Sequence, residues 1–176
     1  MIDALVVTVI GADRPGLVSL VSERGRAHGA SWERSRMASL AGQFAGIVHF
    51  QVPAENVAAL TAALLELESL GLRVVVATGS GTPSTAAVRT LKLELVGQDR
   101  PGIVRDISRV LAELGISIQE LNTEISSAAM SGEHMFTAEA MLHVPASVPT
   151  AELSRVLETL ANELMVDVTL DEAGHS

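Results

Sequence analysis

The chain has 176 residues and a mass of 18.4 kDa, which is enough for one ordinary domain or two small ones. Hydrophobic residues make up 48% of it but aromatic residues only 2%, so any core must be built from aliphatic side chains and Met. Cysteine is absent, which excludes disulfides, thiol nucleophiles and cysteine metal sites. No apolar run approaches the roughly 20 residues that span a bilayer, and we expect a soluble cytoplasmic protein.

Most of the negative charge lies in the second half of the chain. Residues 1–81 contain six Lys or Arg and seven Asp or Glu, whereas residues 86–176 contain six and fourteen, so −8 of the net charge of −9 comes from the second segment. Binding to nucleic-acid phosphates requires clustered cations, so we expect no direct nucleic-acid binding. The one basic cluster is explained by cations near a helix C-terminus and on a solvated strand face. It comprises Arg24, Arg26, Arg34 and Arg36.

The same unusual phrase occurs twice in the chain. VIGADRPGLV occupies residues 9–18, and LVGQDRPGIV occupies residues 95–104. In both copies a glycine stands 14 positions after the proline, and later a Phe-to-Pro segment spans nine positions. The second copy has six extra residues, around SSAAMSGEH at 126–134. Self-similarity on this scale indicates a duplicated structural unit.

The first unit reads as strand, helix, strand, strand, helix, strand. Its first strand has two alternating apolar sets, and either set, for example Val6, Thr8 and Ile10, could line an open sheet face. A helix follows and ends near Gly29, because glycine suits the left-handed conformation that closes a helix. Two strands are then predicted, at 31–40 and 43–52. The next helix has an apolar stripe of Val57, Leu60, Leu64 and Leu67, and LRVVVAT forms the last strand.

The second unit repeats this order. TLKLELV alternates leucine with charged residues, which is the period of a strand with one buried face. A helix that ends at Gly115 is predicted from the spacing of Ile103, Ile107, Val110, Leu111 and Leu114. Two strands are then predicted, at about 116–127 and 134–144. The second helix has an apolar stripe of Leu153, Val156, Leu157, Leu160 and Leu164, and VDVTL forms the last strand.

This βαββαβ order, with right-handed crossovers, predicts a four-stranded antiparallel sheet with two helices on one face in each unit. The fold class is therefore α+β, with two ferredoxin-like domains in tandem. We expect the domains at residues 1–79 and 88–176, joined by a Gly-, Ser- and Thr-rich linker at 80–87. Because open sheet faces and edges need cover, the units could pair inside one chain across the linker, and we also expect self-association as a homodimer.

The repeated phrase places polar groups at the start of the first helix of each unit. Proline has a fixed φ angle that suits the start of a helix, and the following glycine has no side chain to cover the backbone amides. The exposed amides form a binding site for a carboxylate or phosphate. Asp13 and Asp99 stand beside these sites and could accept an ammonium group. The combination fits the backbone of a free amino acid. A purely structural interpretation is also open, since Asp is a common helix cap and Pro a common helix starter.

GADRPGLV and GQDRPGIV, each between an apolar strand and an amphipathic helix, resemble the start of ACT domains, small regulatory modules that bind amino acids. SWERSRMASLAGQFAGIVHFQVP and LNTEISSAAMSGEHMFTAEAMLHVP are similar to segments of the glycine cleavage repressor family, so that the resemblance covers nearly the whole chain. It implies a non-enzymatic regulator that binds a small amino acid, above all glycine, and acts through a DNA-binding activator protein. It also implies effector-binding residues in the loops after the first strands: Asp13, Arg14, Pro15 and Gly16, with Asp99, Arg100, Pro101 and Gly102.

Other chemistry has little support in the sequence. Tyr is absent along with Cys, no G-x-S-x-G occurs, and GSGTPS lacks the third glycine of a dinucleotide-binding loop. His49, His134 and His143 do not have zinc-site spacing, so we expect no metal and no cofactor. Two alternatives stay open. One is an amino-acid-sensing regulatory subunit that acts in trans on a metabolic enzyme, and the other is a small enzyme that uses Glu133 and His134 of the inserted loop.

Overall fold

The structure is a computed structural model that describes residues 1–79 and 87–173. The chain divides into two compact units, Met1–Pro83 and Ser84–Ser176. The linker predicted at 80–87 lies outside the described residues, except for Ala87.

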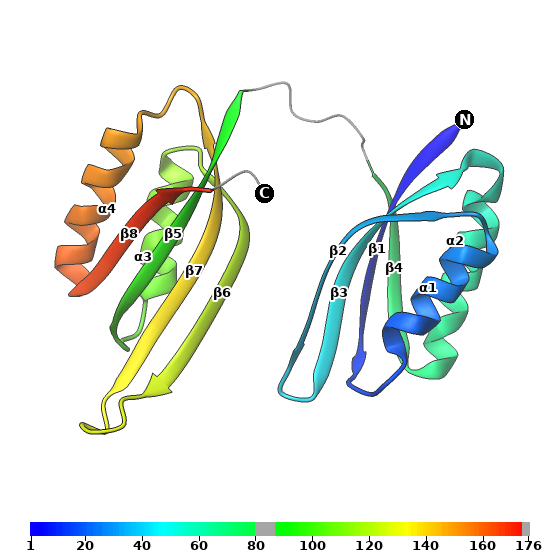
Figure 1. Ribbon diagram of the computed structural model, residues 1–176, viewed down its shortest axis with the longest axis horizontal. Coiled ribbons are helices and arrows are strands. Elements are labelled where there is room, and N and C mark those ends of the chain that lie inside the picture. The colour runs from blue at the N-terminus through cyan, green and yellow to red at the C-terminus, as the bar shows by residue number, and fades with distance from the viewer. Residues whose placement is uncertain (80–86, 174–176) are drawn as a thin grey trace. The chain divides into compact units, whose positions relative to one another are not determined.

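The first unit has the predicted order of elements (Figure 1). They are β1 (Ile2–Ala12), α1 (Leu17–Ala27), β2 (Ser31–Leu40), β3 (Gln43–Pro53), α2 (Val57–Leu65) and β4 (Leu72–Thr78). Two short 3-10 helices, η1 (Ala54–Asn56) and η2 (Glu66–Leu70), flank α2. The strands form one sheet in the order β2-β3-β1-β4, and every neighbouring pair is antiparallel. α1 and α2 lie together on one face of this sheet (Figure 1).

The second unit repeats the same plan. Its elements are β5 (Val88–Gln98), α3 (Ile103–Glu113), β6 (Ser117–Ser127), β7 (His134–Pro145), α4 (Thr150–Leu164) and β8 (Val166–Glu172). The sheet order is β6-β7-β5-β8, again antiparallel throughout, with α3 and α4 on one face (Figure 1). The predicted fold class, α+β with two ferredoxin-like βαββαβ domains in tandem, is confirmed.

Alternation along the strands gives each sheet a buried face and an open face. In β1 the odd-numbered apolar residues are at most 1% exposed: Leu5, Val7 and Val9. Val6, Thr8 and Ile10 therefore line the open face, away from α1 and α2. Trp32 of β2 packs edge-to-face on the buried ring of Phe50, with 5.3 Å between ring centroids, so this side of the sheet belongs to the core.

The helix patterns predicted from the sequence are largely confirmed. Gly29 and Gly115 follow α1 and α3 with φ angles of +69° and +70°, the left-handed conformation that the pattern required. The apolar stripes of the second helices are buried in both units, apart from the half-buried Val57 and Val156. The stripe of the first unit extends past α2, because its last residue, Leu67, lies in η2.

The basic cluster of the sequence separates into two places. Arg24 and Arg26 lie in the last turn of α1, where cations favour the negative end of the helix, and Arg34 and Arg36 lie on β2.

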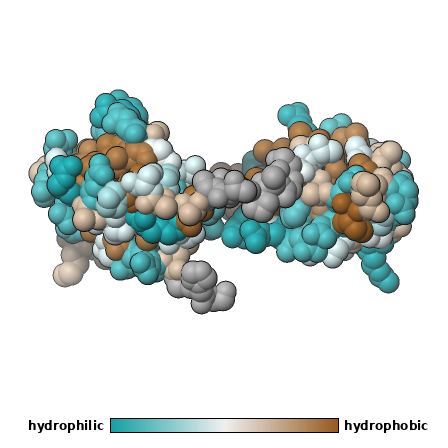
Figure 2. All heavy atoms as spheres, turned by 90° about the horizontal axis from the view of Figure 1, so that it is seen from above, coloured by the Kyte–Doolittle hydropathy of each residue, from teal (hydrophilic) through white to brown (hydrophobic). Residues whose placement is uncertain are grey.

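Large apolar side chains also stand exposed among hydrophilic ones on both units (Figure 2). None of the helices within 1–79 and 87–173 is long and apolar enough to cross a membrane.

Candidate functional site

The first Asp-Arg-Pro-Gly loop, residues 13–16, connects β1 to α1. Gly16 occupies the N-cap position with φ +92° and ψ −2°, and no side chain caps the helix. α1 also has no acidic residue in its first turn, so no carboxylate of that turn offsets the positive helix end. A Cβ built on Gly16 would meet no atom within 4 Å. The positive end of α1 is therefore open to an anion.

Hydrogen bonds tie this loop to two neighbouring segments. The Asp13 carboxylate accepts a hydrogen bond from Ser39 Oγ at 2.6 Å, and the Asp13 amide donates to the Gly42 carbonyl at 2.9 Å. Arg14 Nη2 donates to the Leu70 carbonyl at the end of η2. Both side chains stay exposed, so the loop is held in place while its polar groups remain accessible.

The second loop, residues 99–102, connects β5 to α3 with the same backbone shape. Gly102 is the N-cap, with φ +93° and ψ 0°, again without a side-chain cap. The Asp99 amide donates to the His134 carbonyl at 2.8 Å, which matches the bond from Asp13 to the β2–β3 turn. Across the described part of the chain, no hydrogen bond to the Asp99 carboxylate is found. An ammonium group could therefore reach this carboxylate.

The two loops differ at the helix end. Asp106 lies in the first turn of α3 and accepts a hydrogen bond from Arg105 Nε at 3.0 Å. A Cβ on Gly102 would lie 3.2 Å from Arg105 Nη2, whereas the space around Gly16 is empty. The Asp106 carboxylate offsets part of the positive charge at the helix end, and Arg105 occupies space beside the cap. The helix N-terminus at the first loop is therefore more accessible to a carboxylate than the one at the second loop.

The interpretation of the two aspartates as helix caps is wrong. A glycine holds the N-cap position in both loops, and no side chain makes a capping hydrogen bond there. Ser39, Gly42 and Leu70, which hold the first loop, were not predicted. The signal that could have found Gly42 is strand pairing, since Ala12 at the end of β1 pairs with Gln43 at the start of β3.

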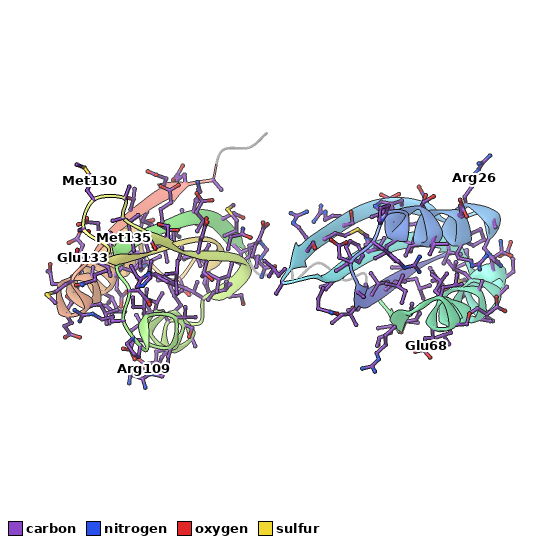
Figure 3. All side chains as sticks on the ribbon, turned by 90° about the horizontal axis from the view of Figure 1, so that it is seen from below. Arg26, Glu68, Arg109, Met130, Glu133 and Met135 are labelled. Atoms are coloured by element: carbon purple, nitrogen blue, oxygen red, sulfur yellow. The ribbon has the colours of Figure 1, made fainter. Side chains whose placement is uncertain are left out.

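The inserted segment of the second unit forms the connection between β6 and β7. It is closed by a hydrogen bond from the Ala128 amide to the Glu133 carbonyl at 2.8 Å. Figure 3 shows Met130 pointing away from the unit at the tip of this connection. His49 and His143 lie in β3 and β7, half-buried, as predicted. Among residues 1–79 and 87–173, no group of three or more His, Asp or Glu side chains is arranged to hold a metal ion.

Family models match both units: residues 3–77 match an ACT domain model, and residues 92–148 match another. The chain belongs to the ACT-domain family. Each match includes one Asp-Arg-Pro-Gly loop and the whole of the following first helix. The two ACT domains stand in tandem, as the duplicated phrase predicted.

Similarity to individual proteins extends over the full length of the chain. The glycine cleavage system transcriptional repressor of Escherichia coli strain K12 is 22% identical over 173 residues, which cover 98% of this chain and 91% of the repressor. The crystal structure of an unknown protein from Galdieria sulphuraria is 31% identical, with a TM-score of 0.88, and covers 99% of this chain and 100% of its own. A crystal structure of a candidate glycine cleavage system transcriptional repressor shares the fold, with a TM-score of 0.73 at 19% identity over 99% of both chains.

Proposed function

We propose that this tandem ACT-domain protein is a non-enzymatic regulator that binds a small amino acid, glycine above all, and controls transcription of glycine-cleavage genes through a partner activator protein. The observation that carries the proposal is the full-length similarity to the Escherichia coli repressor. ACT domains over both units support the coarser role, an amino-acid-sensing regulator. Such a role would place the protein in the cytoplasm, where it would act as a homodimer.

In this proposal the effector binds at the Asp-Arg-Pro-Gly loops, Asp13–Gly16 and Asp99–Gly102. The amino-acid carboxylate would bind the bare amides at the N-terminus of α1, and the ammonium group would bind the Asp13 carboxylate. The bond from Ser39 to Asp13 Oδ2 supports this assignment, because it orients the carboxylate and leaves Oδ1 available. Arg14, Pro15 and Gly16 would shape the loop. The first loop is the stronger site, since no acidic residue of the first turn competes there.

The charge distribution supports action through a protein partner. Residues 86–176 carry −8 of the formal charge, which disfavours contact with DNA phosphates. A DNA-binding activator, itself basic, would be attracted to such a surface. Capture of a metabolic enzyme, without any DNA-binding protein, would favour the alternative of a regulatory subunit acting in trans.

Thermal unfolding with and without added amino acids tests the sensor. A ligand that binds only the native state at a hundredfold excess over its Kd stabilises by about 2.7 kcal/mol, which raises Tm by roughly 5 to 10 °C in a chain of this size. Glycine should produce this shift in the wild type and in Asp99→Asn but not in Asp13→Asn, which keeps the size of the side chain and removes its charge. No shift with any amino acid would refute the sensor.

A further inference from the structure

The open face of the first unit combines arginines with exposed apolar side chains. We call it the first open face; its main residues are Ile10, Arg34, Arg36, Ile47, Arg73 and Val75. The arginines lie on the two edge strands, β2 and β4. Ile10 and Ile47, on the central strands β1 and β3, are 46% and 52% exposed, and Val75, on the edge strand β4, is 60% exposed. The acidic residue beside them along β2, Glu33, lies at the bulge between Trp32 and Arg34.

The open face of the second unit has the opposite charge. We call it the second open face; its carboxylates are Glu94, Glu120, Glu124, Glu139, Asp167 and Asp171. Strand pairing puts two of these carboxylates on the edge strand β6 and two on the edge strand β8. Lys92 is the only lysine of the chain and stands in the centre of this face, on β5. The first open face therefore has three guanidinium groups, and the second has six carboxylates and one ammonium group.

Pairing within the second sheet does not relieve this negative charge. Glu94 and Glu139 stand directly opposite each other on β5 and β7, an arrangement that destabilises a sheet unless a cation lies between them. Lys92 Nζ contacts both carboxylates, Glu139 at 3.6 Å and Glu94 more closely. The hydrogen bond to Glu94 raises the pKa of Lys92 above its ordinary value. One ammonium group is thus shared between two carboxylates, and the face keeps an excess of negative charge.

The two open faces complement each other in sign. Both have charged side chains on the edge strands, but the central strands have Ile10 and Ile47 in the first face and Lys92, Glu94 and Glu139 in the second. A shallow hollow in the second open face is lined by Glu94, Asn122, Glu124 and Glu139, and its carboxylates suit a guanidinium group. Two first faces would repel each other, and so would two second faces. Only unlike faces attract.

We propose that the first open face of one copy packs against the second open face of another copy, and the reverse, so that two identical interfaces close a homodimer. A basic partner protein would cover the second face alone, whereas a second copy covers both faces of both chains. A reciprocal pair of contacts also closes without leaving a surface for further growth. The proposal rests on the self-association proposed above and names the surface that makes it.

Charge reversal tests the pairing in the full-length chain. Variant A carries Arg34→Glu, Arg36→Glu and Arg73→Glu, which makes both open faces acidic. Variant B carries Glu120→Arg, Glu124→Arg, Asp167→Arg and Asp171→Arg, which makes both faces basic. Each variant alone should dimerise about 100-fold more weakly than the wild type in sedimentation equilibrium, because both interfaces become repulsive. An equimolar mixture should dimerise again, since each interface then joins one acidic and one basic face.

Two controls separate this effect from general charge and from folding. A control chain makes the same charge change as variant A, but on the helices, with Arg26→Glu, Arg109→Glu and Arg155→Glu. Arg26 and Arg109 point away from their sheets (Figure 3). This control should dimerise like the wild type. Circular dichroism and Trp32 fluorescence report whether each variant is folded. A chain that carries all seven substitutions of variants A and B has an acidic first face and a basic second face. It should therefore form a homodimer, and it tests the pairing even if variant A or variant B alone does not fold.

Three results would overturn the proposal. If A and B both dimerise like the wild type, another surface makes the dimer, and the proposed self-association survives while this interface fails. If the wild type stays monomeric at micromolar concentration, both the interface and the homodimer fail. If A and B are monomeric but their mixture does not dimerise, the faces do not pair between copies. A Tm shift with glycine is measured separately, so the sensor is judged independently of all three results.

Discussion

Replacing Gly16 by alanine should destabilise the first unit through backbone strain alone. Gly16 has φ +92°, a conformation that L-residues rarely adopt, and a new Cβ would contact no atom within 4 Å. A left-handed conformation costs a residue with a Cβ about 1–2 kcal/mol. Alanine also lowers the entropy of the unfolded chain, which returns less than about 1 kcal/mol. The net loss should be roughly 1 kcal/mol, and Gly16→Asn should lose less because Asn tolerates positive φ.

The measurement uses a fluorophore that lies in the same unit. Trp32 is the only tryptophan of the chain and packs on Phe50 in the first core, so its emission follows the unfolding of this unit. With an m value of about 1–3 kcal/mol per molar urea, the midpoint should fall by roughly 0.5 M while m stays constant. Gly102→Ala is the matched variant in the second unit, with φ +93° at the same loop position, and is followed by circular dichroism.

Either of two results would refute backbone strain at Gly16. If Gly16→Ala leaves the urea midpoint of the Trp32 signal unchanged, the left-handed cap is not under the strain that the φ angle implies. If Gly16→Asn costs as much as Gly16→Ala, the loss comes from adding a side chain of any kind, not from the conformation. Only the order glycine, asparagine, alanine supports the strain argument.

Two further predictions concern packing and titration. A Cβ on Gly97 would lie 2.4 Å from Val166 Cγ1, 2.9 Å from Val166 Cβ and 3.0 Å from Val166 Cα, so Gly97→Ala should cost about 2 kcal/mol of unfolding free energy by urea titration. Because Val166→Ala keeps the Cβ and Cα atoms, it should relieve only part of the clash; an unchanged midpoint in Gly97→Ala would contradict the clash. Lys92 is the only lysine, and Tyr and Cys are absent, so no other side chain of these types titrates in the same alkaline range. Because the pKa of Lys92 is raised in the folded protein, its charge stabilises the fold fully below pH 10.5, and this stabilisation is lost as the pH rises through the raised pKa. Urea midpoints at about pH 9 and about pH 12 should differ more in the wild type than in Lys92→Met, and an equal difference would exclude Lys92.

Local patterns predicted the elements because strands and helices here follow simple periods. β2 spans Ser31–Leu40, as predicted, and the predicted strand 43–52 falls one residue short of β3. Gly29 and Gly115 marked helix ends because few other residues accept positive φ. The open face of β1 could not be predicted, since both alternating sets are apolar and only the position of α1 and α2 decides which set is buried.

The loop contacts were beyond the sequence because they join distant positions. Ser39 bonds to Asp13 across 26 positions, and the contact depends on the register between β1 and β3. The sequence also left open that Asp caps the helix, whereas the backbone places Gly16 at the N-cap in a left-handed conformation, without a side-chain capping hydrogen bond. Arg105 and Asp106 stand next to the second phrase, yet their effect on the helix end follows only from the fold.

Duplication explains why the two units share a fold but not why they differ where they do. A shared fold requires the glycine cap, the proline and the buried leucines in both copies, and these are present. It does not require the side chains on the open faces of the edge strands to be arginines in one sheet and carboxylates in the other, because water solvates positive and negative charges alike. Copies that paired like with like would need faces that do not repel. The proposed ligand sites differ as well, because α1 has no acidic residue in its first turn whereas α3 has Asp106. Opposite charges at equivalent outward positions therefore point to pairing of unlike faces.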